Sequence, residues 1–132
     1  MGFENVNWIA VVVAAIVALV IGAGWFSRYL FGERWQAAVG KGQEEMGSPA
    51  TAMAIALIGY LVMATVLARV MPAGASVGVA LMWGFMVWLG FMATATLISS
   101  AFEGAIGAAQ WIYLGNLLVV SLAMAVVIAV FG

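Results

Sequence analysis

The chain contains no cysteine and no histidine. These two absences exclude disulfide bonds, thiol nucleophiles, imidazole bases, haem ligation and the soft-metal sites that thiolates and imidazoles build. Charged residues are also scarce: they make up 7% of the 132 residues, against about 25% in a typical soluble domain. Most enzyme classes lose their catalytic groups with these residues. We therefore expect no enzymatic activity, no cofactor and no metal site.

The net charge is -1, with four Lys and Arg residues in all, which is too few to form a basic patch for nucleic acid. Apolar residues are abundant instead. They make up 67% of the chain, against about 45–50% in soluble domains, and the mean hydropathy is +1.22. We conclude that the chain is an integral membrane protein, and we expect its surface to contact membrane lipid.

Hydropathy divides the chain into four apolar segments, at residues 7–27, 50–70, 76–99 and 108–131. Each is long enough to cross a bilayer core of about 30 Å as a helix. The segments are apolar on every side, whereas strands of a membrane barrel alternate apolar and polar residues. The sequence therefore predicts an all-α fold, a single transmembrane domain of four helices.

Two connections between the predicted spans differ in length and character. The short one, around Pro72, leaves room only for a tight turn before Ser76 caps the third span, so we expect spans two and three to be antiparallel neighbours. The long one carries Phe31, Trp35 and Val39 on one helical face. This spacing predicts a short interfacial amphipathic helix, although a solvated loop anchored by a tryptophan is an open alternative.

Small residues recur every fourth position along the first span, at Ala14, Ala18 and Gly22. Residues spaced by four lie on one helix face, and small residues on such a face let two helix backbones approach closely. We predict helix packing through these three positions, with chance recurrence in an alanine-rich span as the alternative.

Five short motifs carry a family resemblance: Asn7-Trp8, Gly22-x-x-Trp25-Phe26, Leu30-Phe31-Gly32-x-x-Trp35, Phe102-Glu103-Gly104 and Gly115-Asn116-Leu117-Leu118-Val119. With them the chain resembles, over essentially its whole length, the small bacterial membrane proteins of the domain of unknown function 1761 family. The resemblance implies a four-span protein of a bacterial cell membrane and supplies no activity. Where the family often has a Tyr-His pair in its last span, this sequence has Gly115 and Asn116, so no role for an imidazole carries over.

Polar side chains punctuate the later part of the chain at Thr96, Ser99, Glu103, Gln110, Tyr113 and Asn116. On a helix, Thr96, Ser99 and Glu103 fall within about 60° of one another. Topology brings the ends of spans one and three and the start of span four to one membrane surface, whatever the orientation. Because a carboxylate at that boundary is costly unless paired or hydrated, Arg28 and Arg34 are candidate ion-pair partners of Glu103.

These residues support two hypotheses of function. In the first, Glu103 is held in a structural ion pair and the protein is a structural or accessory bundle that acts as a homo-oligomer or partner subunit. In the second, Glu103 titrates, and the polar residues line the path of a channel or secondary transporter for a small solute or proton at a subunit or helix interface. We favour the first, because proton-coupled transporters usually place their acid near the bilayer midplane. The first span also lacks the carboxylate on which small multidrug resistance transporters rely.

The distribution of basic residues predicts an orientation. The segment between the first two spans carries Arg28, Arg34 and Lys41, whereas the other exposed segments share only Arg69. Basic loops remain in the cytoplasm, so we expect this segment inside the cell and both chain termini outside. Reporter fusions at the C-terminus and near Gly42 should show an external terminus and a cytoplasmic loop. The reverse pattern would overturn this orientation.

Overall fold

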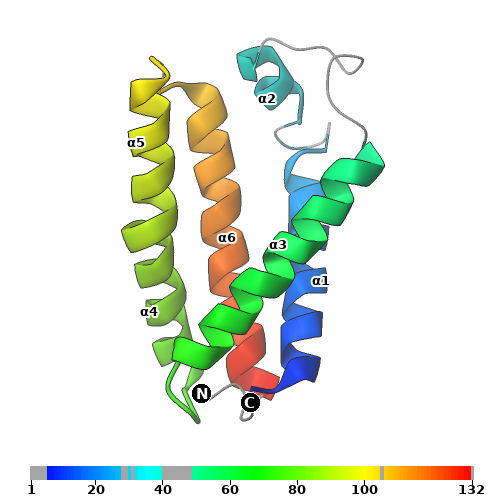
Figure 1. Cartoon of the computed structure of the whole chain (residues 1–132), viewed down its shortest axis with the longest axis vertical. Coiled ribbons are helices and arrows are strands. Elements are labelled where there is room, and N and C mark those ends of the chain that lie inside the picture. The colour runs from blue at the N-terminus through cyan, green and yellow to red at the C-terminus, as the bar shows by residue number, and fades with distance from the viewer. Residues whose placement is uncertain (1–5, 28–29, 31, 40–48, 105, 132) are drawn as a thin grey trace.

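The computed structural model describes residues 6–27, 30, 32–39, 49–104 and 106–131, and this part of the chain is helical, with no strand (Figure 1). The helices in chain order are α1 (Trp8–Trp25), α2 (Gly32–Val39), α3 (Pro49–Val70), α4 (Val77–Val87), the π-helix η2 (Trp88–Ala93), α5 (Thr94–Phe102) and α6 (Ala108–Phe131). Because α4, η2 and α5 run on without a break, the described part of the chain has four helices long and apolar enough to cross a membrane. The predicted all-α fold with four such helices is confirmed.

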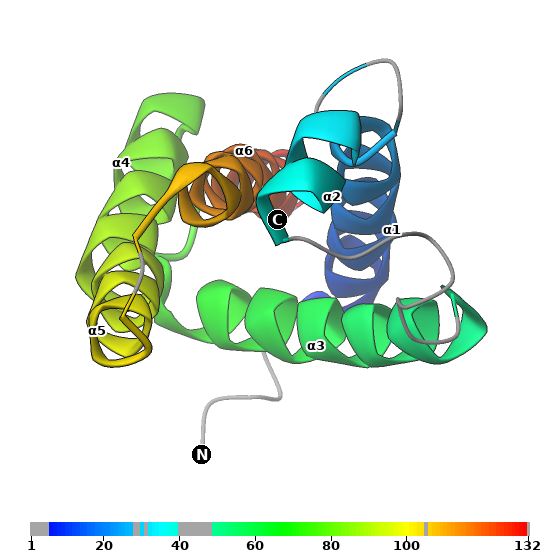
Figure 2. The same cartoon turned by 90° about the horizontal axis from the view of Figure 1, so that it is seen from above.

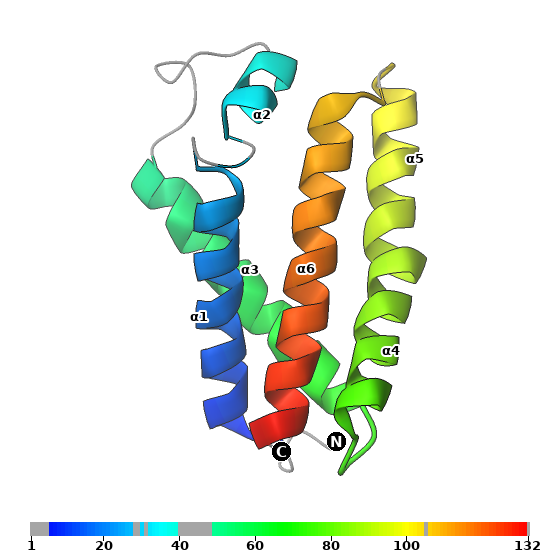
Figure 3. The same cartoon turned by 180° about the vertical axis from the view of Figure 1, so that it is seen from behind.

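Helix α6 lies at the centre of the bundle. It packs most extensively against α1 on one side and α4 on the other, while α3 packs mainly against α1, and α2 lies over the first part of α6. Figures 1 and 3 show α6 between α1 and the α4–α5 helix. Of the four long helices, α6 has the largest share of buried residues and α3 the smallest. The core is therefore built around α6.

Side-chain caps define two of the helix starts. The Oδ1 atom of Asn7 accepts hydrogen bonds from the backbone N–H groups of Ile9 and Ala10, at 3.1 and 3.2 Å. The Oγ atom of Ser76 accepts one from Val79 N at 3.2 Å, as the sequence predicted. Such caps satisfy N–H groups that have no partner within the helix. Both caps start helices at the end of the bundle where α6 finishes.

The contact between α4 and α6 depends on a glycine. Ser121 Oγ donates a buried hydrogen bond to the carbonyl oxygen of Gly84 at 2.7 Å. A Cβ atom built on Gly84 would lie 2.9 Å from Ser121 O and 3.1 Å from the Cα atom of Leu122. The absence of a side chain at Gly84 thus lets the two backbones touch, as at other close helix crossings in membranes.

Buried alanines allow a similar close approach of α1. Ala10, Ala14 and Ala18 are fully buried, and Ala14 and Ala18 belong to a core that also contains Val120 and Met124 of α6. Two of these alanines belong to the predicted packing face. They let α1 lie close to its neighbours α6 and α3.

The prediction that spans two and three are antiparallel neighbours is wrong. Among the described residues, α3 makes no extensive contact with α4, and Figure 2 shows it running away from the α4–α5 helix. The short connection, with Gly74 in the left-handed region at φ +71°, brings together only the two helix ends. Packing then sets each direction separately: Ala64 and Leu67 of α3 are buried in the core beside α1, while Gly84 holds α4 against α6.

The helix between α4 and α5 widens into a π-helix, which the sequence did not predict. Within it, Trp88 Nε1 donates a hydrogen bond to the carbonyl oxygen of Leu114 in α6 at 2.9 Å. At its end, Thr94 Oγ1 donates a hydrogen bond to the carbonyl oxygen of Gly90, four residues earlier, at 2.8 Å. The π-helix therefore occurs where the third span contacts α6 through Trp88.

The close approach of α4 and α6 predicts a steric penalty for any side chain at Gly84. Gly84→Ala should lower the free energy of unfolding by about 1–3 kcal/mol, because the new methyl group meets backbone rather than a movable side chain. Gly59→Ala in α3 is the matched control: its Cβ would meet nothing within 4 Å, so it should be neutral or stabilise by up to about 1 kcal/mol. Reversible unfolding in bicelles measures both, and equal effects would contradict this account of the contact.

Candidate functional site

The predicted polar residues do not converge on one cavity. Ser99, Glu103 and Tyr113 are exposed, Thr96 and Gln110 are half-buried, and Asn116 is buried. These six side chains therefore lie in different environments and do not form one site.

Glu103 lies at the C-cap of α5, where Gly104, with φ +94°, ends the helix. Helix α2, which carries Arg34, lies at the same end of the bundle, as the topology predicted (Figure 1). Both Glu103 and Arg34 are exposed, and no ion pair joins them in the described part of the chain. The other candidate partner, Arg28, lies outside the described residues. Of the two predicted pairs, the one with Arg34 is absent from this structure.

Arg34 is kept from Glu103 by the position of its helix. Helix α2 packs on α6, and Trp35 meets the ring of Phe26 edge-to-face, with the ring centroids 5.3 Å apart. The predicted short helix is thus present and is held near the end of α1. Glu103 lies on the other side of α6, at the end of α5.

Gln110 serves the start of α6. Its Oε1 atom accepts a hydrogen bond from Gly107 N at 2.8 Å. A Gln at the third helical position that reaches back to the N-cap residue is one half of a capping box. This local role accounts for Gln110.

Asn116 is the polar residue that the fold buries most deeply. It is 1% exposed, and its Oδ1 atom has no hydrogen-bond partner within the described structure. A Cβ atom built on Gly22 of α1 would lie 3.6 Å from Tyr60 Oη of α3 and 3.9 Å from Asn116 Oδ1. Helices α3 and α6 therefore each place one side-chain oxygen beside Gly22 of α1. We call this place the Asn116 notch and define it by Gly22, Tyr60 and Asn116.

Sequence analysis identified Asn116 as a site residue and Gly22 as a packing residue, but it missed Tyr60. The signal was a hydroxyl group in the middle of an apolar span, with only Ala56 and Ala64 four residues away to receive it. A polar group without a partner on its own helix indicates a partner on another helix. The identity of that partner depends on helix contacts that a single span does not encode.

Two tryptophans donate hydrogen bonds to α6 that the sequence analysis did not anticipate. Trp25 Nε1 donates to Ile112 O, and Trp88 Nε1 donates to Leu114 O, each at 2.9 Å. Gly115 makes room for the first indole, because a Cβ there would lie 2.8 Å from Trp25 Cζ2.

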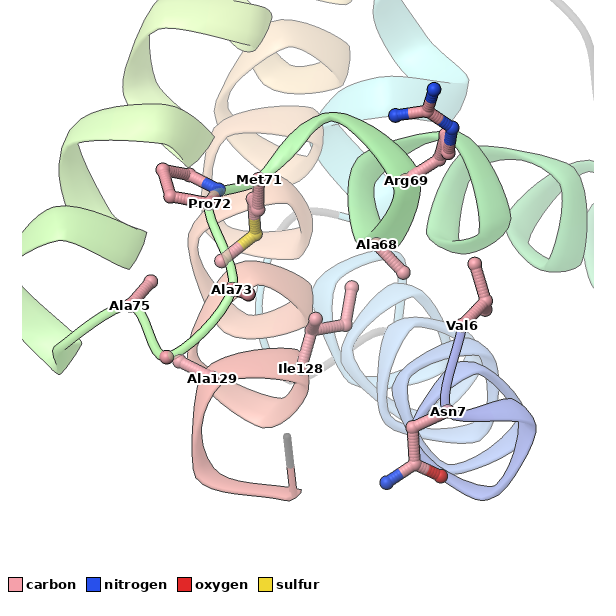
Figure 4. A pocket seen from close by; sticks show the side chains of 11 residues that line it. Val6, Asn7, Ala68, Arg69, Met71, Pro72, Ala73, Ala75, Ile128 and Ala129 are labelled. Atoms are coloured by element: carbon pink, nitrogen blue, oxygen red, sulfur yellow. The ribbon is translucent and has the colours of Figure 1, made fainter. Parts of the chain in front are cut away.

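A cavity of about 330 Å³ lies at the opposite end of the bundle, between the start of α1, the end of α3 and the end of α6. Its wall is mainly small and apolar, and Figure 4 shows the Arg69 guanidinium pointing away from Ala68, Met71 and Ile128. Asn7 Nδ2 closes one side by donating to Phe131 O at 2.8 Å. Among the described residues, no three acidic, His or Cys side chains gather to hold a metal ion, here or elsewhere.

The exposure of Glu103 predicts a small effect on stability. Glu103→Ala and Glu103→Gln should both change the free energy of unfolding by no more than about 0.5 kcal/mol, as is usual for a surface position. Unfolding of the two variants in bicelles at neutral pH measures this. A loss of about 3 kcal/mol or more in Glu103→Ala would instead reveal a buried pair with a cation.

The chain matches the model of the family described as "Protein of unknown function (DUF1761)" over residues 9–129. No curated protein and no solved structure gave a match. The matched residues run from the first turn of α1 to the last turn of α6. The predicted family is thereby confirmed: the chain belongs to the DUF1761 family of proteins of unknown function.

Proposed function

We propose that this protein is a non-enzymatic membrane subunit that acts as a homo-oligomer, in which α3 of one copy packs against a neighbouring copy. The observation that carries the proposal is a line of contact residues on α3 that the chain itself covers only in part. Such a line is complete only when a second helix lies along all of it.

The contact residues follow one another at spacings of four and three: Met53, Leu57, Tyr60, Ala64 and Leu67 in α3, and Met71 directly after its last residue. We call this line the α3 seam. Alternating spacings of three and four are typical of the face by which one helix packs on another. The later members Ala64, Leu67 and Met71 are 0%, 4% and 7% exposed, but Met53 and Leu57 are 53% and 36% exposed.

The uncovered part of the seam belongs to a longer exposed stretch. From Ala50 to Gly59 every residue except Ala56 is exposed. Figures 1 and 2 show this half of α3 leaning away from α5 and α6. Among the described residues, this half of α3 is therefore covered by other helices only in part, at Ala56 and Leu57.

The two sides of this stretch differ in composition. The outer side carries large branched residues, with Ile55 66%, Ile58 63% and Val62 59% exposed, which suits contact with lipid chains. The seam is flanked by Ala50, Ala54 and Ala56 instead. Since no hydrophobic force drives helices together in lipid, small residues mark the faces where backbones pack closely. This difference favours a helix over lipid as the neighbour of the seam.

We further propose the setting of this assembly: a bacterial cell membrane, with the segment that contains α2 in the cytoplasm and both termini outside. The charge distribution supports it, as described above. The arrangement of the helices is compatible with it, because α1 begins and α6 ends at one end of the bundle while α2 lies at the other (Figure 1).

A channel or transporter remains the second candidate. The observation that favours it is the exposure of Ser99 and Glu103 on α5, which places these polar groups where a neighbouring copy could meet them. A path lined by them would have to lie between subunits. The same assembly is therefore a requirement of both candidates.

Cysteine crosslinking tests the assembly on a chain that has no native cysteine. Met53→Cys and Leu57→Cys lie on the seam, and both should form crosslinked dimers in native membranes, with an oxidant or a short bifunctional maleimide. Ile55→Cys and Ile58→Cys are matched controls at the same depth on the outer side of α3. They should remain largely monomeric, because lipid covers that side.

Equal crosslinking on both sides of α3 would indicate random collision and contradict the proposed interface. Native mass spectrometry from mild detergent provides the second measurement. A monomer over a wide range of protein concentrations, together with no crosslink at Met53 or Leu57, would rule out the homo-oligomer.

A further inference from the structure

The two oxygens of the Asn116 notch face the same point beside Gly22. A Cβ atom built on Gly22 would lie at ordinary contact distance from both of them, 3.6 Å from Tyr60 Oη and 3.9 Å from Asn116 Oδ1. Both oxygens therefore border the place that the missing side chain of Gly22 leaves open.

The chemistry of the notch is that of two oxygens. Asn116 Oδ1 can only accept a hydrogen bond, while the Tyr60 hydroxyl can donate one or accept one. Because Asn116 is 1% exposed and its oxygen has no partner among the described residues, the oxygen carries the full cost of losing water. A molecule that donates a hydrogen bond would remove that cost.

The surroundings select a neutral molecule. The helices that form the notch, α1, α3 and α6, contain no acidic residue, so a cation would have no counter-charge in this apolar region. An anion would face the carbonyl-type oxygen of Asn116. A buried polar site with two hydrogen-bonding partners, beside a position without a side chain, is the kind of place where proteins hold a bound water.

We propose that the Asn116 notch binds one water molecule, which donates a hydrogen bond to Asn116 Oδ1 and forms a second with Tyr60 Oη. The water joins α3 and α6 beside the end of α1. This position is where α3 leaves the core: Ala64 is fully buried one turn after Tyr60, whereas Leu57 is 36% exposed just before it. The water thus supplies a polar contact between α3 and α6 at the point where α3 leaves the core.

The test uses the whole protein in lipid nanodiscs and water itself as the probe. Rotating-frame NMR cross-peaks should connect a water resonance to the side-chain amide protons of Asn116, with the sign of a dipolar contact rather than of proton exchange. Gly22→Ala should abolish these cross-peaks, because its methyl group occupies the notch. Gly24→Ala is the matched control: it lies on the same helix and its Cβ would meet nothing within 4 Å, so it should retain them.

Thermal unfolding gives a second readout, because the Tm of Gly22→Ala should change in opposite directions for a hydrated and a dry notch. With water in the notch, Gly22→Ala displaces it and leaves two oxygens unpaired, so its Tm should fall below that of Gly24→Ala. With a dry notch the methyl group would fill a void, and the Tm of Gly22→Ala should equal or exceed that of the control.

The NMR measurement on the unsubstituted protein tests the proposal even if Gly22→Ala does not fold. Absence of a water cross-peak at an assigned Asn116 amide would overturn the proposal. A hydroxyl proton of Tyr60 in direct contact with Asn116, without water, would also overturn it. The proposal is independent of assembly, because the three residues of the notch belong to one chain.

Discussion

Lipid gives a polar group no water to bond with, and this protein meets that constraint on α6. Between the described residues, every hydrogen bond that joins two long helices has one partner on α6. Trp25 and Trp88 donate to its backbone carbonyls, Ser121 donates from it to Gly84, and the Asn7 cap donates to its last turn. Helices α1 and α4 are therefore attached to α6 by polar contacts as well as by packing.

Small residues supply the space that these contacts need. Gly84 lets α4 touch the backbone of α6, and Gly115 accepts the Trp25 ring against the helix surface. Ala14 and Ala18 are fully buried, and their small side chains let α1 pack closely against its neighbours. Helix α3 has a weaker attachment to α6: it contacts α6 less than α1 does, and the first two residues of its seam, Met53 and Leu57, are exposed. The least attached helix is thus the one we propose for contact with a second copy.

Hydropathy was sufficient to predict the fold class, because four long apolar runs in a chain with few charges have one common solution in a membrane. Local signals were also sufficient where both partners are close in sequence, as for the Ser76 cap. The arrangement of the helices relative to one another was not predictable from hydropathy or local signals. Loop length suggested that spans two and three are neighbours, but a short loop constrains helix ends and not crossing angles.

The candidate site shows the same limit. Topology placed Glu103 at the same end of the bundle as Arg34, yet it could not show that α2 carries Arg34 to the other side of α6. The sequence identified Asn116 as a polar residue within a span but could not supply Tyr60, which comes from another helix. The roles of Trp25 and Trp88 depend on carbonyl oxygens far away in sequence, which carry no sequence signal of their own. Partners between helices had to come from the structure.

An experimental structure of the protein in a lipid bilayer tests the account most directly, because it reports the position of α3 relative to both α6 and any neighbour. The account predicts α6 in contact with α1 and α4, the Ser121 hydroxyl on the Gly84 carbonyl, and a helix of a second copy against Met53 and Leu57. A structure in which α3 lies along α4 and α5 of its own chain, with Leu57 buried there, would contradict it.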